Sequence, residues 1–236
     1  MTPDEMDREW LSVSGGGGPA GLASPRLLRI TRGFSCVFWS MPLLSTAHAM
    51  ALMSFMPARW MVAGLLAGYL PLGCGLGLLA TGGDLTPRWA ARVRLAALLA
   101  LAGLALSPFL AWWGAVPLRL YFAANAAAHY VASVALLAGL NRLAGECARR
   151  LDDLPLRRES QAGLIVTLWL SACTVGVVAW LFRRTGILSA GTETILWHLS
   201  RLRGEAYLLC LLPYAMTAYV LWRAKETGLR HAVGAA

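Results

Sequence analysis

Four polar side chains recur at every fourth position of one apolar segment and are well placed to do chemistry. They are Tyr121, Asn125, His129 and Ser133, and this spacing puts them on one face of a helix. Alanines fill most of the positions between Tyr121 and His129, so neighbouring helices could approach closely. Because lipid offers no hydrogen-bond partner, the polar face must contact protein or a cavity. It is either a ligand, cofactor or proton position at His129, or a hydrogen-bond ladder that packs helices together.

A second histidine, His48, lies in another apolar segment. With both segments treated as helices across a membrane, its depth differs from that of His129 by ~5 Å, at about 1.5 Å of rise per residue. Two histidines on different helices could ligate the iron of one b-type haem axially, or line a quinone site. The alternative is a pair of core histidines satisfied by protein groups. The sequence leaves the cofactor unknown, with haem b as the specific hypothesis.

The motifs of common catalytic classes are absent. The sequence contains no Walker motif, HExxH, GxSxG or CxxC, and its five cysteines are scattered, which gives no metal-ligand spacing. The apolar segments contain no Asp, Glu, Lys or Arg, whereas ion-coupled carriers normally hold their ion with an intramembrane charge. We therefore expect no catalytic residues and a non-enzymatic protein.

The elements that position these residues are predicted to be transmembrane helices. Hydrophobic residues make up 58% of the 236 residues and charged residues 14%, and the mean hydropathy is +0.58, which is too little charge for a water-facing surface. Each apolar block approaches the ~20 residues that cross a bilayer. The sequence thus predicts an all-α bundle of six spans: Phe34–Phe55, Trp60–Ala80, Leu95–Ala115, Leu120–Leu140, Ala162–Phe182 and Ala206–Trp222.

Basic residues set the expected orientation. With both termini in the cytoplasm, 15 Lys and Arg lie on the cytoplasmic side and 6 outside, which favours this topology in a cell inner membrane. Residues 1–33 are expected to be a flexible tail ending in a basic segment along the headgroups, and residues 223–236 a second tail. The run around Ala47-His48-Ala49 imitates a signal-peptide cleavage site, but it stays apolar to Phe55, which favours a span. The basic residues behind the net charge of +9 are expected to contact anionic lipid headgroups. Nucleic acid is not expected as a partner.

Two loops have helical character. Asn141–Leu154 is expected to extend the fourth span until Pro155, with pairs Glu146–Arg150 and Arg149–Asp153. Thr194–Arg203 is expected to be a short interfacial helix on the outer surface, with Trp197 at the interface and His198 and Arg201 on the polar side.

Small residues and polar repeats favour packing between helices. The second span has Gly64-x-x-x-Gly68 and Gly73-x-x-x-Gly77, and the sixth repeats Tyr214 and Thr217 on one face. Such faces are typical of interhelical contacts.

These observations lead to three hypotheses. The first is a non-enzymatic membrane subunit that packs against other membrane protein subunits in a larger complex. The second is a permease component that moves an uncharged or lipidic substrate with a separate ATPase. The third is a redox subunit that binds b-type haem or quinone near His48 and His129.

Overall fold

The computed structural model describes residues 24–52, 58–83, 85–116, 118–184, 194, 197 and 211–234. These residues are 92% helical and contain no strand. Their helices are α2 (Ser24–Leu52), α3 (Ala58–Thr81), α4 (Trp89–Leu106), α5 (Pro108–Ala115), α6 (Leu120–Arg150), α7 (Leu154–Arg184) and α10 (Leu212–Gly234). The all-α prediction is confirmed for the described part of the chain.

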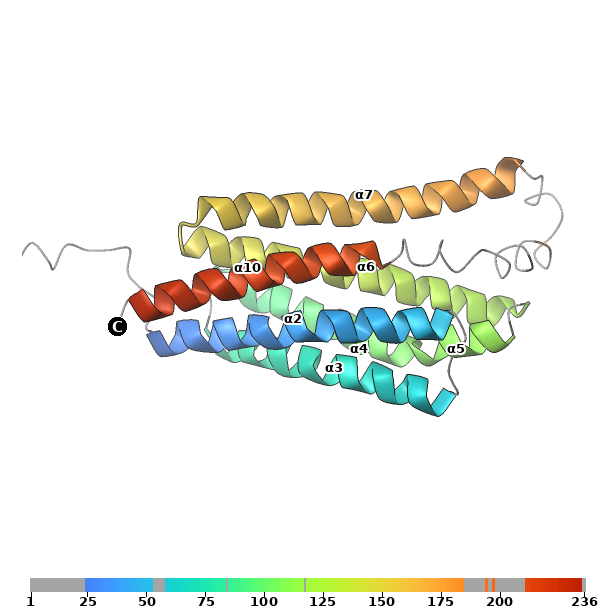
Figure 1. The fold of residues 1–236 in the computed structure, drawn as a ribbon, viewed down its shortest axis with the longest axis horizontal. Coiled ribbons are helices and arrows are strands. Elements are labelled where there is room, and N and C mark those ends of the chain that lie inside the picture. Colours follow the sequence, from blue (N-terminus) through green and yellow to red (C-terminus); the bar gives the residue numbers. More distant parts are fainter. Residues whose placement is uncertain are drawn as a thin grey trace, which may run out of the picture.

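The helices run roughly along one common axis (Figure 1). Helix α2 packs on α3 and α10, α4 packs on α3 and α6, and α6 packs on α10. These five helices therefore form a closed ring of neighbours. Helix α7 packs on α6 and α10 and lies at the edge of the bundle (Figure 1).

Four segments are long and apolar enough to cross a membrane. They are Val62–Thr81, Trp89–Ala115, Leu120–Arg150 and Leu154–Trp180. The second joins α4 and α5 across Ser107, where Pro108 lacks the N–H that would continue the α4 hydrogen-bond ladder. Within the described residues, α2 and α10 do not reach the same hydropathy. Helix α2 contains His48 and several hydroxyl residues, and the second half of α10 is charged, while the start of the predicted span Ala206–Trp222 lies outside the described residues. The described architecture fits a membrane protein.

Both helices at the ends of the described chain are longer than the sequence predicted. The basic segment 26–32 forms the first turns of α2 and buries Leu27, Ile30 and Thr31, so it is part of the bundle and not of a flexible tail. At the other end, residues 223–234 continue α10, with Ala224 and Thr227 fully buried. Packing against neighbouring helices orders segments that composition alone assigned to tails.

Helix α6 extends beyond its span as expected but ends at Arg150, earlier than predicted. Asp152 adopts φ 54°, a left-handed conformation that ends helices. The Asp153 carboxylate then accepts a hydrogen bond from the Leu156 backbone N–H at 2.8 Å and caps α7. Pro155 therefore lies in the first turn of α7, where its missing N–H costs nothing.

The predicted interfacial helix falls mostly outside the described residues. Thr194 and Trp197 are helical, and Trp197 is exposed. His198 and Arg201 are not described.

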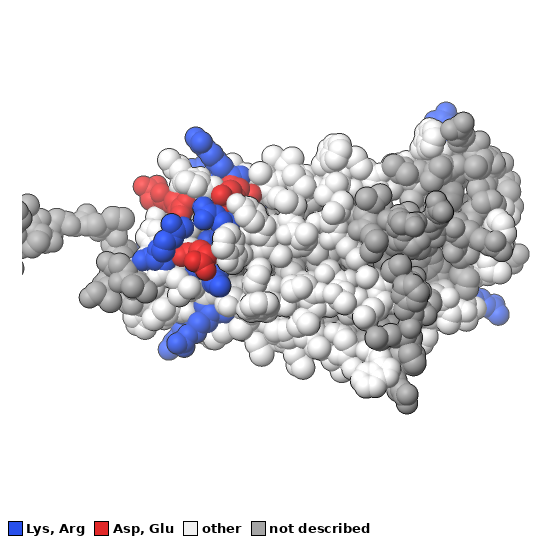
Figure 2. Space-filling view, viewed as in Figure 1, with Lys and Arg blue, Asp and Glu red and all other residues white. Residues whose placement is uncertain are grey.

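Charged side chains gather at one end of the bundle (Figure 2). This charged end is where α2, α4 and α7 begin and where α6 and α10 end. The described acidic residues all belong to its helix ends: Glu146, Asp152, Asp153, Glu159 and Glu226. The long middle of the visible surface carries no charge in its described part (Figure 2), as hydrocarbon would require.

Candidate functional site

Four aromatic side chains meet inside the ring of helices. The His48 ring of α2 lies 4.7 Å from the His129 ring of α6, centroid to centroid, at an interplanar angle of 73°. Tyr69 of α3 and Tyr214 of α10 surround the pair, with centroids 6.5 and 5.7 Å from that of His48. All four side chains are buried. We call these four residues the His–Tyr cluster.

Each helix presents its member of the cluster through close packing. The Tyr69 hydroxyl lies 3.4 Å from His129 Nε2, within hydrogen-bond reach. A Cβ at Gly103 of α4 would come within 2.6 Å of that hydroxyl, so only glycine leaves room for Tyr69 there. Tyr214 is within hydrogen-bond reach of Ser133, one helical turn beyond His129. The cluster thus ties together all five helices of the ring.

The structure divides the predicted polar stripe of α6 into two halves. His129 and Ser133 are buried in the cluster. Asn125 donates to the Tyr121 carbonyl of its own helix at 2.8 Å, and Tyr121 is 65% exposed. The first half therefore lies outside the cluster, and the Tyr121 ring instead contacts Phe109 of α5, with ring centroids 5.6 Å apart.

The cluster does not fit a haem held by both histidines. Axial ligation places the iron about 2 Å from each nitrogen, which requires ring centroids about 6 Å apart. The observed 4.7 Å separation is shorter, and two tyrosine rings fill the space beside the pair.

Comparison with known proteins adds no family to this picture. No protein-family model, curated protein or solved structure matches the chain.

One atom of the cluster has an unusual environment. His48 Nε2 is buried and has no hydrogen-bond partner among the described residues, which costs roughly 1–3 kcal/mol in a typical protein interior. A ligand with a hydroxyl or carbonyl group could use this atom. A ring that served only to pack the helices would not require a nitrogen atom at this position.

Replacing His48 by Phe tests whether the imidazole nitrogens of His48 contribute to stability. The change removes the unpartnered nitrogen but inserts a larger ring, so we expect the two effects to offset each other and the free energy of unfolding to change by less than about 1 kcal/mol. The measurement is unfolding in mixed micelles, followed by tryptophan fluorescence. His129→Phe is the matched comparison and should destabilise more, because it removes the Tyr69 partner. Equal losses in the two variants would contradict this assignment.

A second polar assembly lies at the charged end. The Glu146 carboxylate of α6 is paired with the Arg92 guanidinium of α4, and it accepts a hydrogen bond from the Thr86 hydroxyl at 3.0 Å. Arg149 Nη2 lies 3.7 Å from it. The predicted partner, Arg150, is exposed. The sequence rule for pairs within one helix missed this contact because its partners are on α4 and on the loop before it.

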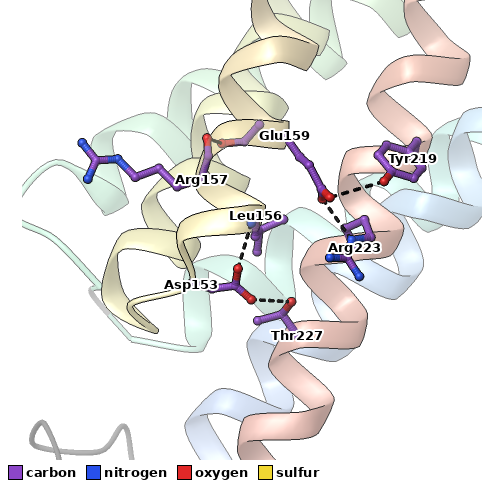
Figure 3. Close-up of polar contacts among 8 residues, drawn as sticks. Asp153, Leu156, Arg157, Glu159, Tyr219, Arg223 and Thr227 are labelled. Atoms are coloured by element: carbon purple, nitrogen blue, oxygen red, sulfur yellow. Dashed lines mark hydrogen bonds and ion pairs between the residues drawn. The ribbon is translucent and has the colours of Figure 1, made fainter.

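Helix α7 is attached to α10 by similar contacts (Figure 3). The Glu159 carboxylate accepts a hydrogen bond from Arg223 Nε at 2.9 Å, which raises the pKa of Arg223. The Thr227 hydroxyl donates to the Asp153 carboxylate at 3.1 Å. Asp153 therefore both caps α7 and fixes its first turn against α10.

Small residues on α3 face in two directions. A Cβ at Gly68 would clash with Leu44 of α2, whereas one at Gly73 or Gly77 would meet nothing within 4 Å. Gly73, Cys74, Gly77 and Ala80 are all exposed. We call these four residues the outer α3 face.

Proposed function

We propose that this chain is a non-enzymatic integral membrane subunit that packs against partner membrane proteins in a larger complex. In this proposal α2 and α10 also cross the bilayer, which gives six spans. The charged end is cytoplasmic, in line with the excess of Lys and Arg there. Both termini are then cytoplasmic, in a cell inner membrane.

The observation that carries the proposal is the outer α3 face. In a bilayer, helices associate through small residues that let their backbones approach, since apolar side chains gain little by leaving lipid. Gly64 and Gly68 already serve this purpose within the chain, against Ala47 and Leu44 of α2. The outer face repeats the motif with no neighbour among the described residues, and a helix from another protein would complete it.

Helix α7 supports the proposal independently. Ala172 and Gly176, four residues apart, are exposed beside the exposed Trp169, and a Cβ at Gly176 would meet nothing within 4 Å. A small-residue face on each of two helices suits a protein with more than one neighbour. In this proposal the His–Tyr cluster is structural and stabilises the packing of the five helices of the ring.

Cys74 belongs to the outer α3 face, so the proposal can be tested by labelling this face without introducing a new cysteine into it. In a variant that retains Cys74 as its one cysteine, the purified chain is labelled at Cys74 with a benzophenone maleimide and reconstituted with native membrane extract. Illumination should then give one discrete adduct with another membrane protein. Adding Gly77→Ile should abolish most of this adduct, because the new side chain fills the face. Mass spectrometry of the adduct identifies the partner.

Ala97→Ile is the matched control. Ala97 is exposed on α4, so the variant adds three carbon atoms, against four in Gly77→Ile, away from the outer α3 face and should leave the adduct intact. Adducts with lipid alone, or loss of the protein adduct in both variants, would contradict the proposal. An adduct of twice the chain mass would identify a second copy, and a partner of a different kind would then be excluded at this face.

A second candidate, a permease component for an uncharged or lipidic substrate, is favoured by a groove between α2 and α10. The groove has a volume of about 540 Å³ and is lined mainly by apolar residues, including Phe38, Met41 and Ala215. It reaches Tyr214 of the His–Tyr cluster. Copurification of an ATP-binding protein with the chain would favour this candidate over the first.

A further inference from the structure

An arginine-lined cavity opens at the charged end, between the start of α4 and the end of α6. Its volume is about 370 Å³, and its polar lining consists of Thr86, Arg88, Arg92, Glu146, Arg149 and Arg150. Four guanidinium groups and one carboxylate leave the lining with a net charge of +3. We call this cavity the arginine pocket.

The charges of the arginine pocket are only partly neutralised by its own carboxylate. Glu146, whose side chain is 2% exposed, is paired with Arg92 and lies 3.7 Å from Arg149. Arg92 in turn lies within electrostatic range of Arg88, Arg149 and the neighbouring Arg142. Like charges held this close repel each other, and an anion in the pocket would relieve that repulsion.

The chemistry of the lining selects a phosphate group. A guanidinium donates two parallel N–H bonds to phosphate oxygens, and several arginines around one cavity can surround such a group. Glu146 fixes Arg92 from the inner side, which leaves Arg88 and Arg150, both exposed, to approach a ligand from the rim.

The surface next to the pocket indicates the source of that phosphate. One turn further along α4, Leu95 and Leu98 are 56% and 63% exposed, so apolar surface begins directly beyond the arginines. A soluble phosphate compound would not use this surface, whereas acyl chains would. We propose that the arginine pocket binds the phosphate group of an anionic lipid, with the lipid tails along α4.

The test measures thermal unfolding of the full chain in an uncharged detergent. Phosphatidylglycerol should raise the unfolding midpoint more than phosphatidylcholine does, and inorganic phosphate alone should have little effect. In Arg88→Gln/Arg150→Gln the apparent affinity for phosphatidylglycerol should fall about tenfold or more. Arg94→Gln/Arg157→Gln is the matched control, because it removes two exposed charges of the same end outside the pocket and should change the affinity less than twofold.

The outcomes are distinct. Equal losses in the two double variants would reduce the effect to general surface charge and overturn the proposal. Saturation by inorganic phosphate, with no further shift from lipid, would overturn the lipid source and identify a soluble anion instead. If the glutamine variant does not fold, Arg88→Lys/Arg150→Lys retains the charge but not the paired N–H geometry, and an affinity like that of the wild type would overturn phosphate recognition by these arginines.

Discussion

Replacing Arg92 by Met is expected to lower the free energy of unfolding by about 3 kcal/mol. The Glu146 carboxylate is 2% exposed, whereas Arg92 is 31% exposed, so the variant leaves the more deeply buried member of the pair without its main counter-charge. Breaking one side of a buried ion pair typically costs about 3–5 kcal/mol. The lower end applies here, because Thr86 still donates to Glu146 and Arg149 lies nearby. The measurement is unfolding in mixed micelles monitored by tryptophan fluorescence.

A double-mutant cycle separates the pair from general charge effects. The double variant Arg92→Met/Glu146→Leu removes both charges and should recover most of the lost stability, since apolar replacement of a buried pair is often close to neutral. Arg94→Met removes a neighbouring exposed arginine of the same helix and should change the free energy by less than about 0.5 kcal/mol. A loss in Arg94→Met equal to that in Arg92→Met would show that the pair has no special role.

The Arg92–Glu146 ion pair could not be predicted from the sequence, although the helices that carry it could. Hydropathy blocks predicted the helical regions, and four of the described segments are long and apolar enough to cross a membrane. They did not predict that the third block divides into α4 and α5 at Ser107. Spacing within a helix suggested Arg150 as the partner of Glu146, since residues four apart share a face. The actual partner, Arg92, is 54 residues away. A pairing of that kind depends on how α4 and α6 lie together, and no local pattern encodes it.

The His–Tyr cluster was predicted in part for the same reason. A similar depth along two helices suggested that His48 and His129 could meet, and their rings are in contact. Tyr69 was missed because a single tyrosine in an apolar, glycine-rich segment gives no periodic signal. The 4.7 Å separation of the histidine rings, which does not suit a haem held by both histidines, depends on side-chain packing that depth alone does not fix.

Glycine spacing in the sequence did not predict which glycines lie between helices. The two GxxxG motifs of α3 look equivalent in the sequence, yet one packs against α2 and the other faces outward. A third contact was not apparent at all, because Gly33 and Gly75 belong to no such motif in common. A Cβ at Gly75 would lie 2.8 Å from the Gly33 carbonyl oxygen, and one at Gly33 would lie 3.0 Å from the Gly75 carbonyl oxygen. This is the reciprocal close approach of α2 and α3.

Replacing Gly75 by Ala is therefore expected to destabilise the protein by about 1–3 kcal/mol. The added methyl group would meet backbone of α2 at Gly33, as well as Val37 Cγ2 at 2.6 Å. Neither neighbour can move aside easily, because the first is main chain and the second is a β-branched side chain with a restricted rotamer. The two helices must separate to accommodate the methyl group, which loses contacts along the most extensive helix pair of the bundle. Unfolding in mixed micelles measures the loss.

Gly77→Ala provides the control within the same helix, two residues away. A Cβ at Gly77 meets nothing within 4 Å, and alanine favours the helix more than glycine by about 1 kcal/mol in soluble hosts. The isolated chain should thus be unchanged or slightly more stable in this variant. Equal destabilisation by the two substitutions would mean that both act through the helix backbone and that α2 and α3 do not meet at Gly75. If Gly77→Ala leaves the isolated chain stable but weakens the Cys74 adduct in membranes, the cost of the methyl group lies in association, as expected for a face that another helix covers.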